Sequence, residues 1–305
     1  MMLTEVFNRA SSFRVHPHLV FIMLTVLTGL FSSSPQAEEK KLRHHQINLS
    51  GNIFYFSMPE DFSRDMPAAD MVESLDISDI TKFDNPEYGN LVRRWWDIKK
   101  PGWFGKQLGT VMMDISVQRV VENRSGFVTA APYNIRERFD FMLMLHESFH
   151  QRYEAINSEA EPEAGRTTAY HAGLFALSGE KIHSLYFDKI YNGQRWMNYA
   201  IAGPQGSTLM VFALPLSTQL YLEVVFTYSP NHGVSPRELG DVAFQKMSYI
   251  ERSFKVHYLE DNPFSDLVGK AWIEKTNTEV LEEHRTTILR IYGIDMNKEQ
   301  PPLPE

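Results

Sequence analysis

IHSLYFDKIYNGQRWMNYAIAGPQGSTLMVFALPLSTQLYLEVVFT, residues 182–227, is the stretch that decides the fold. It holds four closely spaced runs rich in β-branched and aromatic residues, which are typical of strands. The runs are Ile182–Tyr191, Arg195–Ala202, Thr208–Leu216 and Leu220–Thr227. The pair Asn192-Gly193 between the first two runs favours a tight hairpin turn. We therefore expect an antiparallel meander of four strands.

Two further strands are expected before this meander. Ile53–Met58 is rich in β-branched and aromatic residues and stops at Pro59, which is a usual strand end. Gly109–Val121 has a similar composition and is predicted as a second strand. The segment 60–90 between them is acidic and rich in turn-forming residues, with one short amphipathic stretch near Met71–Leu75.

Helices are predicted from capping patterns. Asn134 with Glu137, and Ser235 with Glu238, have the spacing of a capping box, in which each side chain bonds a backbone N–H of the first turn. Thr276 with Glu279 has the same spacing. The predicted helices span about 134–157, 235–255 and 264–292.

This order of elements predicts an α+β fold, an antiparallel meander with helices packed on it and a C-terminal helical appendage. The predicted organisation is a signal peptide at 1–37, a polar linker at 38–47, an α+β sandwich at 48–258, a C-terminal helical extension at 259–293 and a disordered tail at 294–305.

The first residues are typical of an export signal. Arg9 and Arg14 precede an apolar run at 19–31, and three serines follow it. Such a run is too short for a comfortable membrane span, so a signal peptide and a periplasmic location are expected. Pro35 lies unfavourably for cleavage after Ala37, which keeps an uncleaved anchor as the alternative.

Composition restricts the kind of function. The formal net charge is −8 and the pI is near 5.8, whereas nucleic-acid binders usually carry a basic surface. The chain has no cysteine, which excludes disulfides, thiolate metal sites and a cysteine nucleophile.

One catalytic motif is present. His146, Glu147 and His150 spell His-Glu-x-x-His inside the predicted helix 134–157. Residues four apart lie on one helix face, so the two imidazoles could hold one Zn²⁺, with Glu147 as general base. The motif predicts a zinc metallopeptidase.

The surroundings of the motif favour the other interpretation. A catalytic zinc needs a third protein ligand, and Tyr153 and Ile156 occupy the positions of the Gly and third His of the extended motif. The alternative third ligands, none with a recognisable local signature, are Glu159, Glu161, Glu163, His171 and Glu180. An inward-facing pair of histidines could equally be packed among aromatic residues, and we rank that hypothesis first, with no cofactor.

A second candidate site is rich in tryptophan and cations. The residues that we select for partner binding are Arg93, Arg94, Trp95, Trp96 and Trp103. Trp and Arg dominate interaction hot spots, so this stretch could bind a partner protein or anionic lipid headgroups. Alternatively, the tryptophans anchor a long loop to the core while the cations stay solvated.

The stretches FYFSMPEDF (54–62) and VAFQKMSYIERSFKV (242–256) resemble the first strand and closing helix of the PsbP-like family. The resemblance covers roughly 48–258 and is one of pattern. Most proteins of that fold bind partners without catalysis. FSMPEDFSRDMPAAD (56–70), which includes Asp65, also resembles periplasmic immunity proteins that neutralise toxins delivered by type VI secretion. The resemblance implies an exported, non-enzymatic binding protein.

Overall fold

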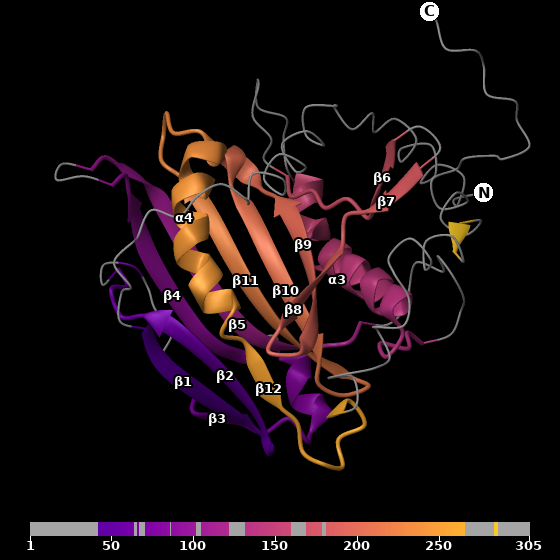
Figure 1. Cartoon of the computed structure of the whole chain (residues 1–305). Coiled ribbons are helices and arrows are strands. Elements are labelled where there is room, and N and C mark those ends of the chain that lie inside the picture. The colour runs from indigo at the N-terminus through magenta and orange to yellow at the C-terminus, as the bar shows by residue number, and fades with distance from the viewer. Residues whose placement is uncertain are drawn as a thin grey trace, which may run out of the picture.

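Antiparallel β-sheet is the main structural element of the described residues (Figure 1). The computed structural model describes residues 42–63, 66, 71–85, 87–101, 105–121, 132–159, 169–178, 181–265 and 284–285. These residues form a six-stranded sheet, a four-stranded sheet, a small two-stranded sheet and two α-helices. None of the described helices is long and apolar enough to cross a lipid bilayer.

The six-stranded sheet is antiparallel throughout, in the order β4-β5-β11-β10-β9-β8. Its strands are β4 (Asn90–Lys99), β5 (Gln107–Arg119), β8 (Phe187–Tyr191), β9 (Gln194–Ala202), β10 (Thr208–Pro215) and β11 (Leu220–Pro230). The turn between β8 and β9 is Asn192-Gly193, with φ of 50° and 79°. Positive φ at both positions is typical of the type I′ turn that joins twisted strands, and the predicted hairpin is confirmed.

The four-stranded sheet joins the start of the described chain to its end, in the order β12-β2-β1-β3. Its strands are β1 (Leu42–Leu49), β2 (Asn52–Pro59), β3 (Ser74–Leu75) and β12 (Lys255–His257). The predicted linker at 38–47 is therefore wrong from Leu42 onward. β1 looks like a linker because the four residues after Leu42 are polar and partly or fully exposed, and only Ile47 and Leu49 near its end are buried.

An aromatic cluster fills the space between the two larger sheets. The Phe54 ring of β2 lies 6.1 Å from that of Trp196 on β9 and 5.8 Å from that of Phe254, just before β12. Trp196 and Phe254 are 5.2 Å apart, measured between ring centroids. All three residues are fully buried, so this cluster holds the small sheet against the large one.

The α-helices cover opposite faces of the six-stranded sheet (Figure 1). Helix α4 (Pro236–Glu251) contacts β11 and β2, and Ser235 caps it by accepting a hydrogen bond from the Glu238 N–H, as predicted. Helix α3 (Arg138–Glu159) packs on the other face, where Phe141 meets Tyr221 of β11. Strand β11 is buried along most of its length because both of its faces are covered.

Helix α3 begins later than predicted. The Asn134 carbonyl accepts a hydrogen bond from the Glu137 N–H in a turn, and the Asp140 carboxylate accepts one from the Asn134 N–H. These contacts fix a turn before the helix, so the predicted capping box at Asn134 is wrong. The short strands β6 (Phe175–Ser178) and β7 (Lys181–Ser184) follow α3 and form the small hairpin.

The predicted α+β class is wrong, because the protein is mostly antiparallel sheet. Among the described residues, one α-helix packs on each face of the large sheet, and a second sheet that was not predicted packs beside α4. The predicted helix at 264–292 and the disordered tail at 294–305 lie almost entirely outside the described residues, as does the signal peptide at 1–37.

Candidate functional site on helix α3

Two histidines of α3 converge on one point. The Nε2 atoms of His146 and His150 are 3.1 Å apart, and His146 Nδ1 lies 3.3 Å from the Tyr186 hydroxyl. Burial, and then the charge of His150, lower the pKa of His146 to about 3. His146 is therefore neutral at physiological pH, the form in which an imidazole binds metals or accepts a hydrogen bond.

This spacing suits either of two kinds of contact. A direct hydrogen bond between the two rings requires one Nε2–H as donor and the other Nε2 as acceptor. Two nitrogens bound to one tetrahedral zinc ion at about 2.1 Å would lie about 3.4 Å apart. The pair is thus arranged as the motif predicts, and its geometry alone fits both hypotheses.

Glu147 lies next to His146 in the chain and is packed inside the protein. Its side chain is buried, and its carboxylate accepts a hydrogen bond of 3.1 Å from Gln151 Nε2. Burial lowers the pKa of His150, while the negative charges of Glu147 and Glu154 act against that decrease. Glu147 therefore lies near His150 and within its electrostatic reach.

A third ligand does not join the two histidines within the described ranges, where no cluster of three His, Asp or Glu side chains could hold a metal ion. His171 pairs through its backbone with Ala202, and Glu159 ends α3 on the surface. Glu161, Glu163 and Glu180 lie outside the described residues.

A buried ion pair beside the histidines was missed by sequence reasoning. Arg152 of α3 donates to both carboxylate oxygens of Glu223 on β11, at 2.7 and 3.3 Å. Tyr199 and Tyr221 flank the pair, and burial, then the charge of Glu223, raise both of their pKa values. The sequence does hold one signal for this ion pair: Glu223 is the single charged residue in the otherwise apolar run 220–226, and a buried charge needs a partner.

The tryptophan- and arginine-rich stretch is strand β4 rather than a surface loop. Trp96 is completely buried, with Lys246 Nζ 5.7 Å from the centre of its ring. The Trp95 carbonyl accepts a hydrogen bond from the Ser63 N–H, and Arg94 lies over the Phe62 ring. The alternation of a strand has thus divided these residues between the two faces of the sheet.

Arg93 is the exposed member of this stretch, and its Nε donates to Asp114 Oδ1 at 2.7 Å. Burial raises the pKa of Asp114, against the opposing effect of Arg93. Trp103 lies outside the described residues. Trp96 is not available to a partner, so the five residues do not form one binding surface.

A groove of about 410 Å³ lies between α4, the end of β4 and the segment after β2. Its lining includes Ile98, Val242 and an ion pair of 3.0 Å between Lys246 and Asp61. The groove lies on the α4 side of the six-stranded sheet, away from the α3 histidines.

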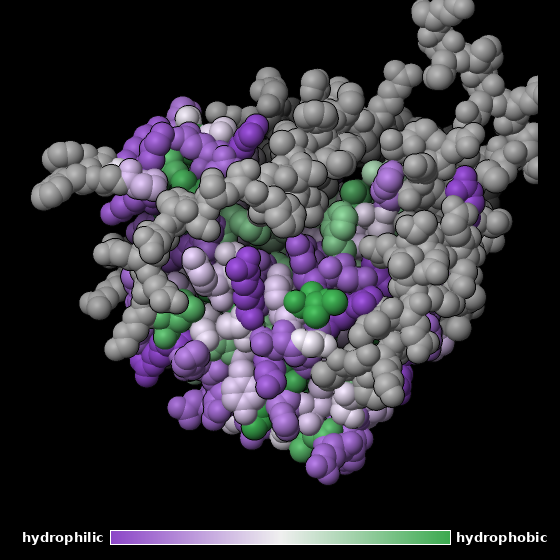
Figure 2. All heavy atoms as spheres, viewed as in Figure 1, coloured by the Kyte–Doolittle hydropathy of each residue, from purple (hydrophilic) through white to green (hydrophobic). Residues whose placement is uncertain are grey.

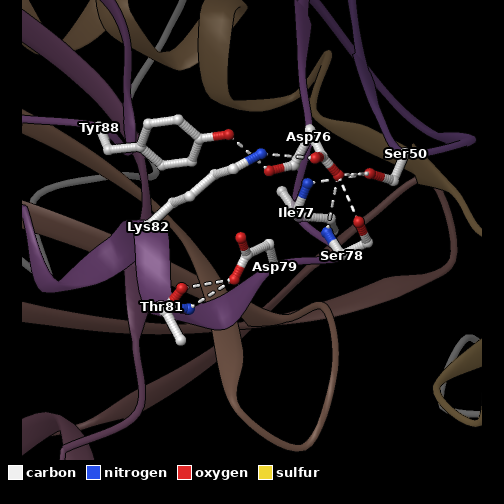
Figure 3. Close-up of polar contacts among 8 residues, drawn as sticks. All are labelled: Ser50, Asp76, Ile77, Ser78, Asp79, Thr81, Lys82 and Tyr88. Atoms are coloured by element: carbon white, nitrogen blue, oxygen red, sulfur yellow. Dashed lines mark hydrogen bonds and ion pairs between the residues drawn. The ribbon is translucent and has the colours of Figure 1, made fainter.

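Asp76 is the centre of an exposed polar network (Figure 3). Its carboxylate accepts hydrogen bonds from Ser50 Oγ, the Ser78 N–H and hydroxyl, and Lys82 Nζ. These bonds, with that of Lys82 the largest effect, hold the pKa of Asp76 well below its usual value. The network ties the β1–β2 turn to the short 3₁₀ helix η2 (Ile80–Asp84), which indicates a structural role.

Comparison with known proteins adds no function to these observations. No known protein-family model matches the chain, and the search of curated proteins finds no match. The functional argument rests on the geometry of the described residues.

Proposed function

We propose that the protein is an exported binding protein that acts by holding a partner protein and not by catalysis. In its sharpest form it is a periplasmic immunity protein that neutralises an antibacterial toxin. The observation that carries the proposal is the engagement of the motif residues with other side chains of the fold. Glu147 is buried and accepts a hydrogen bond from Gln151, and the half-buried His146 lies beside the Tyr186 hydroxyl. His150 is exposed, and its ring contacts that of His146.

The composition and ends of the chain support the same proposal. The N-terminal pattern favours export, and the acidic composition does not suit nucleic acid. A mostly β protein with a closed core offers sheet edges and faces for protein contacts.

A growth assay tests this proposal. The products of the neighbouring genes are first tested for a secreted protein that kills cells, this protein is then produced with it in the periplasm, and cell survival is measured. We expect the wild type and Glu147→Gln to protect equally, because the substitution keeps the shape of the side chain and removes only the base. Protection by the wild type that is lost in a folded Glu147→Gln variant would overturn a non-catalytic mechanism. A failure of both to protect would overturn the immunity function.

A zinc metallopeptidase is the second candidate, favoured by the 3.1 Å separation of the two Nε2 atoms. In that function His146 and His150 would be ligands and Glu147 the general base. Elemental mass spectrometry on protein purified from the periplasm, without chelators or a His tag, tests it. About one zinc per chain, lost in the His146→Ala/His150→Ala double variant, would support the peptidase. A folded, metal-free protein would contradict it.

A further inference from the structure

Strand β8 is the outer strand of the six-stranded sheet and pairs with β9 alone among the described strands. Tyr191 and Gln194 flank a two-residue turn, and such a pair exchanges both of its backbone hydrogen bonds. Alternation along β8 then directs the backbone groups of Phe187, Lys189 and Tyr191 toward β9. The N–H and C=O groups of Asp188 and Ile190 face the outer edge, where no described backbone group pairs with them.

The free edge is held in place by its surroundings. Asn192 Nδ2, at the end of β8, donates to the carbonyls of Arg252 and Phe254 at 3.1 and 3.0 Å. The Asp188 carboxylate accepts from Arg138 and Arg195, so its charge is compensated by two cations. A strand fixed in this way loses little conformational entropy when it binds an additional strand.

The edge also exposes an apolar side chain. Ile190 is 61% exposed, more than any other large hydrophobic residue of the described surface. Figure 2, in the view of Figure 1, shows an isolated hydrophobic spot amid hydrophilic surface where β8 lies. Edge strands usually avoid pairing through charges, proline or bulges. β8 has a regular register and no proline. Its two charged residues differ: Asp188 forms ion pairs with Arg138 and Arg195, whereas Lys189 forms none among the described residues and acts on Glu251 of α4 only through its charge.

Lys189 decides which kind of strand fits. A second copy that paired antiparallel through the outward groups of Asp188 and Ile190 would place the two Lys189 side chains directly opposite each other. Like charges in this position are destabilising, whereas opposite charges attract across the strands. A partner strand with a carboxylate opposite Lys189 and apolar neighbours beside Ile190 therefore fits, and a second copy of this chain does not.

We infer that β8 is a docking edge, at which an extended segment of a partner protein adds as a further strand with an acidic residue opposite Lys189. The inference rests on the proposed binding function and names its surface. Main-chain hydrogen bonds to Asp188 and Ile190 would supply affinity, and Lys189 and Ile190 would supply specificity.

A peptide titration tests the edge independently of any natural partner. The probe is the capped peptide Thr-Val-Glu-Val-Thr, added to ¹⁵N-labelled protein, with Thr-Val-Lys-Val-Thr as the matched control. We expect saturable amide shifts at Asp188 and Ile190, and binding of the lysine peptide weaker by about tenfold. The absence of shifts at β8, or equal binding of both peptides, would overturn the inference.

Ile190→Pro provides the matched variant. Proline at this position removes an outward N–H and keeps the pairing with β9, which edge strands tolerate. A folded Ile190→Pro protein should bind the glutamate peptide about tenfold more weakly, whereas Tyr249→Ala, at an exposed position of α4, should bind it normally.

The survival assay then separates the two proposals. A loss of protection in Ile190→Pro supports the docking edge, and full protection by that variant overturns it while the binding function stands. A wild-type protein that does not protect overturns the immunity function, and the peptide titration still decides whether β8 is a docking edge.

Discussion

The ion pair between Arg152 and Glu223 joins α3 to the middle of the large sheet. Glu223 is 2% exposed on the central strand β11, while the Arg152 side chain keeps partial contact with solvent. Replacing Glu223 by Gln leaves the arginine charge without its carboxylate. We expect the free energy of unfolding to fall by about 3 kcal/mol, which urea denaturation followed by circular dichroism would measure.

A double variant separates the unpaired charge from lost packing. Arg152→Met with Glu223→Leu removes both charges and keeps apolar volume, so it should recover about half or more of the lost stability. A double variant as unstable as Glu223→Gln would show that the carboxylate acts through contacts other than Arg152.

Glu251, at the end of α4, should make stability depend on pH. Burial raises its pKa above the usual value, against a hydrogen bond from Tyr191 and the charges of Lys189 and Arg252. A raised folded-state pKa gives stability that is present below the unfolded pKa and is lost as pH rises through the folded pKa. Glu251→Gln should remove this loss of stability at higher pH, because the glutamine side chain does not ionise.

The measurement compares wild type and Glu251→Gln by denaturation at about pH 4 and about pH 8. We expect the variant to gain stability over the wild type at the higher pH, with the gain vanishing at the lower one. An equal difference at both pH values would contradict a raised pKa of Glu251.

Part of the α3 site could be predicted from the sequence, residue by residue. Helical spacing predicts that His146 and His150 share a face, and their Nε2 atoms indeed lie 3.1 Å apart. Helical spacing alone does not show that Glu147 is buried or that Arg152 reaches Glu223, because both depend on the sheet that covers this flank of α3. The Arg152–Glu223 pair needs residues far apart in the chain, so local periodicity does not contain it.

Among the elements, the β8–β9 hairpin depends on its turn. Gly193 has a φ of 79°, and an added Cβ there would meet no other atom within 4 Å. Gly193→Ala should therefore lose about 1 kcal/mol of stability, all of it from backbone conformation. Thermal unfolding followed by circular dichroism would measure the change.

Gly240 inside α4 is the matched control. An added Cβ there also meets nothing within 4 Å, and its backbone is helical. Gly240→Ala should gain about 0.5–1 kcal/mol, since alanine favours helix more than glycine does. Destabilisation in both variants would indicate that tight packing, and not the sign of φ, controls these positions.

Elements with strong local signals were predicted well, and others were not. The strands at 53–58 and 109–121 and the helix capped by Ser235 appear within a few residues of their predicted bounds. β1 and β4 were missed because exposed polar or charged residues alternate with their buried ones. Their identity as strands depends on pairing with β2 and β5, which local composition does not reveal.

For the molecule as a whole, Phe54 is a test of how firmly the two sheets are joined. Phe54 of β2 contacts Trp196 of the large sheet and Phe254, and none of the three side chains is exposed to solvent. Phe54→Ala leaves a cavity in this cluster and should lower the free energy of unfolding by about 3–5 kcal/mol. Urea denaturation should show one transition shifted to lower concentration, because the sheets share this core.

Tyr249→Ala, on the exposed side of α4, is the control and should change stability by less than about 0.5 kcal/mol. Two separate transitions in Phe54→Ala would indicate that the small sheet unfolds by itself.

The fold class could not be derived from the sequence because the second sheet depends on contacts between residues far apart in the chain. The meander and its hairpin were predictable, since their strands are neighbours in the chain. The second sheet arises because β12 at 255–257 pairs with β2 at 53–55, about two hundred residues earlier. Because this pairing cannot be seen in the sequence, β2 and the segment after α4 were assigned to a single α+β domain with one sheet.

The pairing of β2 with β12 also constrains how the protein is made. The hairpin of β1 and β2 is the first of the described strands to be synthesised, but Trp196 and Phe254, which cover Phe54 from the other parts of the fold, come much later in the chain. The body therefore completes its fold only after nearly all of the described chain has left the ribosome. A core that is completed so late leaves the proposed export time to proceed while the chain is still unfolded.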